Sequence, residues 1–284
     1  MRRALGLILV GALGAGCSGS NTESTQEPPA KQKPTRKHDA AVAVVESPAT
    51  GYIALADIDV AAPTAPPKVG ARAWAVVTRA DLKVWVSVIT TVTSVTGENA
   101  IVGEARWETK TAFVHPIRRE VKSGDVYLLV EEYGRVKSVR DGKLLVQQFD
   151  KDEPVMESEH PAEFVFAVEP GWSTAAPVSF KDEAGLWRGG TLVHRGEATT
   201  YVVGDQPRYG QLVAVPSDKV WLIDAFAKIE KGAQVRALRR DGGIDRFRPA
   251  IVTEVHGDYA AYTVMFSDKT ESLVSIGRVF VAAN

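Results

Sequence analysis

The stretch 231–238 reads KGAQVRAL, and a related stretch, KVGARAWAV, stands at 68–76. A third version of the same opening, KSGDVYLL, occupies 122–129. Each version places a glycine before a run that is rich in valine, leucine, alanine and aromatic residues. A glycine turn that leads into such a run is typical of the start of a β-strand.

The segments that follow these openings also recur. WRGGTLVH at 187–194 parallels FRPAIV at 247–252, and TYVV at 200–203 parallels YTVMF at 262–266. The repeat period is about 50 residues, which suits a small five-stranded β-barrel.

Beyond residue 67 the chain consists mostly of short runs of Val, Ile, Thr and aromatic residues, separated by Gly, Asp and Pro. Long stretches with helical periodicity are missing, so we expect an all-β protein. The repeats predict four units, at 67–120, 121–174, 175–229 and 230–284.

The last unit resembles a Tudor or Agenet module. Its opening strand at 231–238, its second strand at 247–252 and the stretch VMFSD at 264–268 carry this resemblance. The pattern is most similar to the tandem Tudor readers of the chromatin acetylation machinery. The resemblance implies SH3-like barrels that pack in face-to-face pairs, the first with the second and the third with the fourth.

Tudor readers hold methylated lysine in a cage of aromatic rings by cation–π attraction. At the positions that match the cage, this sequence has Arg239 and Arg248, and only Phe266 remains aromatic. Two guanidinium groups would repel a cation, so the aromatic cage is not retained. The two arginines, beside Phe266 and Asp268, are instead a candidate site for an anionic ligand. The alternative is a solvated hairpin face whose arginine stems cover apolar surface.

The chain has six tryptophans, and most of them are expected in barrel cores or in contacts between barrels. Trp107 differs because it stands among charged residues in EARWE at 104–108. We therefore expect Trp107 at an exposed rim, where it is a further candidate for ligand contact.

The first 16 residues resemble a lipoprotein signal peptide. Two arginines precede an apolar run, and LGAGC at 13–17 resembles a lipobox, although Gly14 stands where the family usually has leucine. The resemblance implies that Cys17, the only cysteine, carries lipid. Residues 17–66 would then form a flexible linker, because 18–37 is polar and rich in proline.

A net charge of −1 does not indicate a nucleic-acid-binding protein, and none of the familiar catalytic or metal-binding motifs occurs. No catalytic residue, metal or cofactor is expected. We predict a non-catalytic binding or assembly module, anchored to the bacterial outer membrane by Cys17 and facing the periplasm. It would hold a protein or an anionic envelope ligand. The alternatives are a structural spacer or scaffold and, third, a hydrolase with a convergent site.

Overall fold

The structure is a computed structural model that describes residues 52–79, 83–129, 132–150, 153–204, 211–241, 244–257 and 260–281. Within these residues, four five-stranded antiparallel sheets form four small barrels, which we number 1 to 4 in chain order. The prediction of an all-β chain built from tandem small SH3-like barrels is confirmed.

The first two barrels share one strand order. Barrel 1 has the order β4-β3-β2-β1-β5, and barrel 2 has the equivalent order β9-β8-β7-β6-β10. The strands of barrel 1 are β1 Arg72–Arg79, β2 Val84–Thr96, β3 Asn99–Val102, β4 Trp107–Lys110 and β5 Val114–Pro116. Those of barrel 2 are β6 Val126–Leu129, β7 Glu132–Arg140, β8 Lys143–Asp150, β9 Glu153–Pro161 and β10 Phe166–Ala167.

Barrels 3 and 4 repeat this order as β14-β13-β12-β11-β15 and β19-β18-β17-β16-β20. Barrel 3 contains β11 Pro177–Lys181, β12 Trp187–Arg195, β13 Thr199–Gly204, β14 Gln211–Pro216 and β15 Val220–Leu222. Barrel 4 contains β16 Gln234–Asp241, β17 Ile244–His256, β18 Ala261–Phe266, β19 Glu271–Ser275 and β20 Val279–Phe280.

A short 3-10 helix precedes the last strand of every barrel. These helices are η2 Thr111–Phe113, η3 Ala162–Phe164, η4 Ser217–Lys219 and η6 Ile276–Arg278. The second strand of every barrel also has a register shift at an equivalent place, next to Val92, Val136, Leu192 and Val252. Such bulges bend a strand and let a small sheet curl into a barrel. The same chain path is therefore built four times.

A tight turn before the first strand explains the glycines of the repeat. Gly70, Gly124 and Gly232 have φ angles of 84°, 86° and 88°, which L-residues with a side chain rarely adopt. In barrel 3 the equivalent residue is Ala175, with φ 61°. The backbone bonds of the turn are the same, because Gly70 N donates to the Val92 oxygen just as Ala175 N donates to the Leu192 oxygen. Barrel 3 thus keeps the turn without its glycine.

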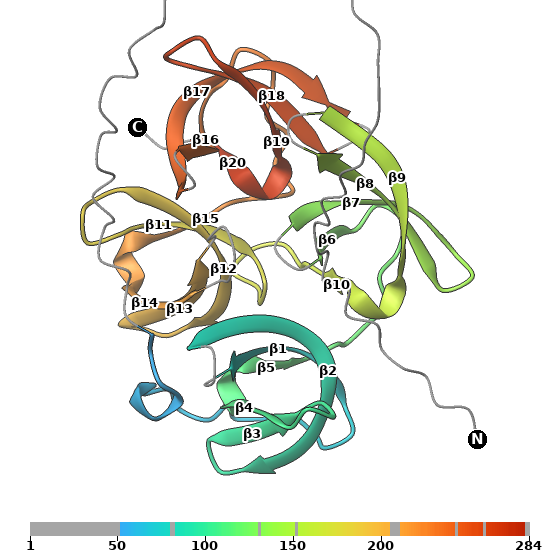
Figure 1. Ribbon diagram of the computed structural model, residues 1–284, viewed down its shortest axis with the longest axis vertical. Helices are drawn as coiled ribbons and strands as arrows, with labels where there is room; N and C mark the ends of the chain where they lie inside the picture. Colours follow the sequence, from blue (N-terminus) through green and yellow to red (C-terminus); the bar gives the residue numbers. More distant parts are fainter. Residues whose placement is uncertain are drawn as a thin grey trace, which may run out of the picture. The chain divides into compact units, whose positions relative to one another are not determined.

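The four barrels lie in a ring, with barrel 4 at the top of Figure 1, barrel 1 at the bottom, and barrels 3 and 2 at the left and right. Barrels 1 and 2 are in contact through the rings of Trp74 and Phe166, whose centroids are 5.8 Å apart, and barrels 3 and 4 are in contact around Phe247. The ring also joins barrel 1 to barrel 3, where the rings of Phe113 and Tyr201 have centroids 5.4 Å apart. Across the ring, the Tyr133 hydroxyl of barrel 2 donates to the Ala175 oxygen of barrel 3 at 3.1 Å.

One buried cluster takes residues from all four barrels, including Trp74, Tyr133, Val193 and Val264. The segment before barrel 1 belongs to it as well. The Trp85 Nε1–H donates to the Ile53 oxygen at 2.8 Å, and Ile58 and Val60 are buried. Residues 52–60 therefore pack against barrel 1. Tyr201 of barrel 3 also reaches it, through a hydroxyl bond to the Asp59 oxygen.

Candidate ligand-binding sites

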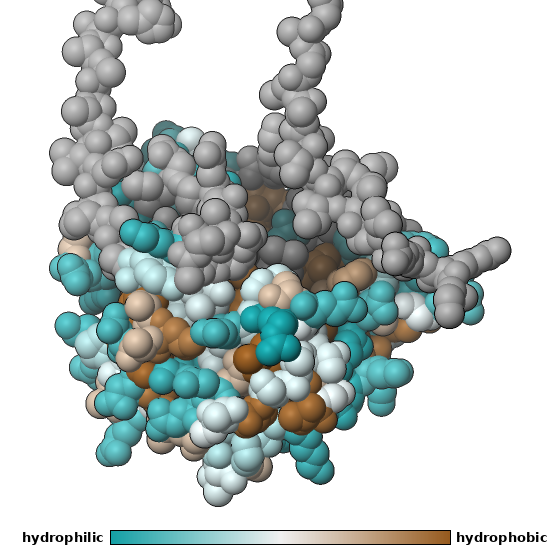
Figure 2. Space-filling model, turned by 60° about the horizontal axis from the view of Figure 1, so that its bottom comes forward, coloured by the Kyte–Doolittle hydropathy of each residue, from teal (hydrophilic) through white to brown (hydrophobic). Residues whose placement is uncertain are grey.

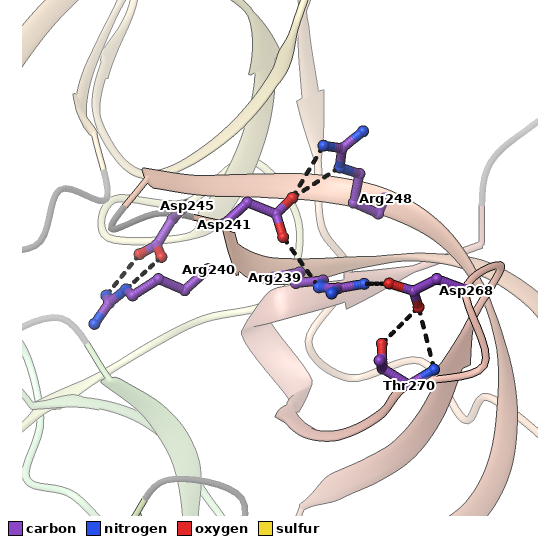
Figure 3. A network of polar contacts seen from close by, with 7 residues as sticks. All are labelled: Arg239, Arg240, Asp241, Asp245, Arg248, Asp268 and Thr270. Atoms are coloured by element: carbon purple, nitrogen blue, oxygen red, sulfur yellow. Dashed lines mark hydrogen bonds and ion pairs between the residues drawn. The ribbon is translucent and has the colours of Figure 1, made fainter. Parts of the chain in front are cut away.

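The structure brings Arg239, Arg248 and Asp268 of barrel 4 into one polar network (Figure 3), and Phe266 lies beside it; we call these four residues and Asp241 the mouth cluster. Arg239 on β16 donates from Nη1 to Asp268 Oδ2 at 2.7 Å, and its guanidinium carbon lies 5.1 Å from the centre of the Phe266 ring. Arg248 on β17 joins the group through Asp241. That carboxylate forms an ion pair with Arg239, whose Nε is 3.0 Å away, and it accepts a hydrogen bond from Arg248 Nε at 3.1 Å.

The charges of this mouth cluster balance, because two arginines face two aspartates. Asp268 also accepts hydrogen bonds from the hydroxyl and the backbone N–H of Thr270. These bonds, together with Arg239, lower the pKa of Asp268 to about 2. An incoming anion would have to displace carboxylates that already hold both arginines. The mouth cluster is therefore a self-neutralised network, and Asp241 is the partner that the sequence interpretation did not assign.

The Phe266 ring is buried, with 3% of its surface exposed, and the Arg239 guanidinium lies over it. Phe266, the only aromatic residue at the positions that match the cage, is thus already in contact with the Arg239 cation.

The opposite face of β16 and β17 packs against barrel 3. Asp245, 4% exposed, accepts from Arg240 Nε and Nη2 at 2.7 and 2.9 Å, and its backbone oxygen accepts from Arg188 of barrel 3 at 3.3 Å. Phe247 lies in the same contact and is buried against Ile223. Phe247 thus belongs to the junction between barrels 3 and 4.

Trp107 is half-buried and packs on the apolar cluster of barrel 1. Trp107 is thus only partly exposed, and its contact with a ligand stays a prediction. Its side chain lies over the turn at Gly103, where an added Cβ would be 3.6 Å from the indole. The charged neighbours in the sequence point to solvent, while the indole at the start of β4 turns toward the barrel.

The remaining tryptophans are less buried than expected. Only Trp74 and Trp85 are fully buried among the six, all of which the structure describes. Trp172 is 38% exposed, and the Arg195 guanidinium lies 3.8 Å from the centre of its ring.

Trp187 and Trp221 form a partly exposed pair where barrel 3 meets barrel 4. Their ring centroids are 4.4 Å apart, with an angle of 52° between the planes. The Lys181 Nζ lies 5.1 Å from the centre of the Trp187 ring and 5.7 Å from that of Trp221. Arg236, on β16 of barrel 4, places its guanidinium 4.9 Å from the Trp187 ring. We call these four residues the seam cluster.

The cations of the seam cluster face aromatic rings and have no carboxylate within ion-pair distance among the residues that the structure describes. The nearest acid in the sequence, Asp182, is held by Arg188 Nε at 2.8 Å and by the Leu186 N–H at 2.8 Å. Lys181 is exposed, so its ammonium is open to solvent. The seam cluster thus offers two uncompensated positive charges beside two indoles.

Sequence interpretation missed this cluster, although a local signal existed. Lys181 stands directly opposite Trp187 across the β11–β12 hairpin, and Ser179 stands opposite Trp221 across β15. A hairpin at 177–191 would have predicted the first of these contacts. The approach of Arg236 depends on how two barrels pack, and no local pattern encodes it.

His115 lies at the contact of barrels 1 and 3. Its Nδ1 is 2.9 Å from the Thr174 hydroxyl, and its ring centre is 5.7 Å from that of Trp74. Its pKa is lowered to about 4, mainly by burial; the Val193 backbone opposes this shift, and the charge of nearby His194 adds to it. A half-buried imidazole packed on an indole fits a structural position.

No family model matches this chain, and no curated protein matches it. Among the described residues, no group of three or more His, Cys, Asp or Glu side chains is placed to hold a metal ion. In that same part of the chain, no helix is long and apolar enough to span a membrane. Cys17 and the signal-peptide stretch lie outside the described residues.

The face at the bottom of Figure 1, where barrel 1 lies, is turned forward in Figure 2. There, hydrophobic side chains occur in small groups between hydrophilic ones. The mouth cluster and the seam cluster are distinguished by their charged side chains and not by apolar patches of this kind. The arginines of the mouth cluster are paired with aspartates, whereas Lys181 and Arg236 of the seam cluster face indole rings.

Proposed function

We propose that this protein is a lipid-anchored, non-catalytic binding module of the bacterial cell envelope that holds an anionic ligand. The observation that carries the proposal is the seam cluster. Lys181 and Arg236 come from two barrels, lie over Trp187 and Trp221, and lack carboxylate partners among the described residues. Charge-assisted bonds from such groups are stronger than bonds between neutral groups. A carboxylate or phosphate on a partner would supply the missing counter-charge.

The position of the cluster supports the same proposal. A site between two barrels needs both barrels to be held in one arrangement, because a shift of either would separate Arg236 from Trp187. Barrels 3 and 4 are held by the buried contact around Phe247 and by the Arg188–Asp245 bond. Preorganised sites of this kind bind more tightly because less freedom is lost on binding.

The membrane attachment rests on the sequence. Lipid on Cys17 would anchor the chain to the outer membrane, and the polar stretch 18–37 would act as a tether. The segment from Tyr52 to Val60 packs into the folded part, so the tether would join the barrels at a buried segment. A ligand held by the barrels would then be held at the membrane. A spacer role is the alternative, and it requires no ligand at the seam.

Two experiments test the proposal. In cell fractionation, the wild-type protein should sediment with membranes and incorporate labelled palmitate, whereas Cys17→Ser should do neither. Labelling of Cys17→Ser would refute the anchor. Calorimetry on full-length Cys17→Ser should then detect binding to at least one polyanion, and a charge reversal at Lys181 should abolish that binding. Absence of any polyanion binding would refute the binding function and favour a spacer.

A further inference from the structure

The two indoles of the seam cluster offer ring faces as well as a place for charge. Trp187 and Trp221 are both partly exposed, and the 52° angle between them makes a bent surface rather than one flat stack. The face of an indole carries negative potential and attracts positively polarised hydrogens. The C–H hydrogens on one face of a sugar ring have this character.

We propose that the seam cluster binds an anionic saccharide, with a sugar ring stacked on the indole pair and its carboxylate held by Arg236 and Lys181. This inference rests on the proposed function, since it names the class of anion that the seam takes. The guanidinium fork of Arg236 suits a carboxylate in two-point contact, and Lys181 supplies a mobile point charge.

The present partners of the two cations are replaceable. Each lies about 5 Å from an indole centre, in a cation–π contact that is weak at exposed sites. A charge-assisted bond to a carboxylate is the stronger contact, so the ligand gains more than the cluster gives up. The mouth cluster of barrel 4 lacks this property, because Asp241 and Asp268 already hold its arginines.

Two other polyanions fit the geometry less well. An acidic peptide carries carboxylates on flexible side chains and offers no rigid apolar face to a tryptophan pair. A single-stranded nucleic acid stacks on aromatic residues but also needs a positively charged groove along its backbone. Here the chain has a net charge of −1, and the arginines of the mouth cluster are neutralised. A sugar ring that carries one carboxylate can stack on the two indoles and place its carboxylate between the two cations.

Isothermal calorimetry on full-length Cys17→Ser tests the inference with four probes of equal length. These are hexagalacturonate, the neutral maltohexaose, hexaglutamate and a thymidine hexanucleotide. Hexagalacturonate should bind most tightly and maltohexaose at least about tenfold more weakly. In the same background, Lys181→Gln and Arg236→Gln should each weaken hexagalacturonate by about tenfold or more. Lys68→Gln removes the same charge from an exposed site at barrel 1 and should have no effect.

Trp221→Ala should weaken binding by about tenfold, and Trp221→Phe, which keeps a ring, should retain most of the affinity. Circular dichroism melts of both variants separate lost binding from lost folding. Unchanged affinity in a folded Trp221→Ala variant would overturn the stacking site. Equal or tighter binding of hexaglutamate or the oligonucleotide, sensitive to Lys181→Gln, would overturn the saccharide class and leave the anion-binding function standing. No binding of any probe would overturn both.

Discussion

Replacing Gly277 with alanine should break the contact between barrels 4 and 2. Gly277 lies in η6 of barrel 4 and is buried. A Cβ added there would lie 2.5 Å from Cδ2 and 2.7 Å from Cβ of Tyr133, on β7 of barrel 2. Real carbon contacts of this length do not occur. Tyr133 cannot simply turn away, because the clash reaches its Cβ and its hydroxyl is bonded to Ala175 and Thr191.

The cost follows from overpacking. Extra methyl groups in a packed interior typically cost about 1–3 kcal/mol, through strained side chains and shifted backbone. Gly277→Ala should therefore lower the free energy of unfolding by about 1–3 kcal/mol, measured by urea denaturation followed by circular dichroism. Gly257→Ala is the matched control in the same barrel, since a Cβ at Gly257 meets no atom of the described residues within 4 Å. Its effect should stay within about 0.5 kcal/mol.

A double-mutant cycle locates the effect. Tyr133→Ala removes the ring that Gly277→Ala would strike, so the two changes should be coupled by about 0.5–3 kcal/mol. If Gly277→Ala proved as mild as Gly257→Ala, or if the two changes simply added, barrels 2 and 4 would not pack as described. The ring of barrels would then be wrong at that contact.

Three further outcomes are expected. In urea titrations, Phe247→Ala should lower the free energy of unfolding by about 3–5 kcal/mol. Ile251→Ala, at a 41% exposed site, should change it by less than about 0.5 kcal/mol. Similar effects of the two variants would contradict the packing of Phe247 between barrels 3 and 4. The folded pKa of His115 is about 4, below its ordinary 6.5, so the contribution of neutral His115 to stability should be complete above pH 6.5 and decrease below that pH, with up to about 2 kcal/mol lost by pH 5. His115→Gln should make the stability depend less on pH in melts between pH 5 and 7. An unchanged pH dependence would contradict the lowered pKa of His115. Arg239→Gln should raise the pKa of Asp268 from about 2 toward its ordinary value in carboxyl NMR titrations, and an unmoved pKa would show that Thr270 alone holds it.

The repeated turn was readable in the sequence because its backbone conformation demands glycine. Gly70, Gly124 and Gly232 all have positive φ, and their spacing predicted barrels 1, 2 and 4. Barrel 3 was predicted from its second and third strands and from the repeat spacing, because Ala175 adopts the same turn at φ 61° without a glycine. The short β-branched runs between these turns were sufficient to predict an all-β fold. The lipid anchor at Cys17 remains a prediction from sequence.

The sites depended on packing between barrels, which strand alternation does not encode. Phe247 and Ile251 lie on the same outer face of β17, opposite Leu238 and Gln234 respectively. Barrel 3 covers Phe247 and leaves Ile251 exposed. Two apolar residues on the same face of one strand therefore differ in burial. Arg236 lies on this face, where its guanidinium reaches Trp187 of barrel 3. Local sequence determines which face of a strand a side chain takes, and only the neighbouring barrel determines what that face meets.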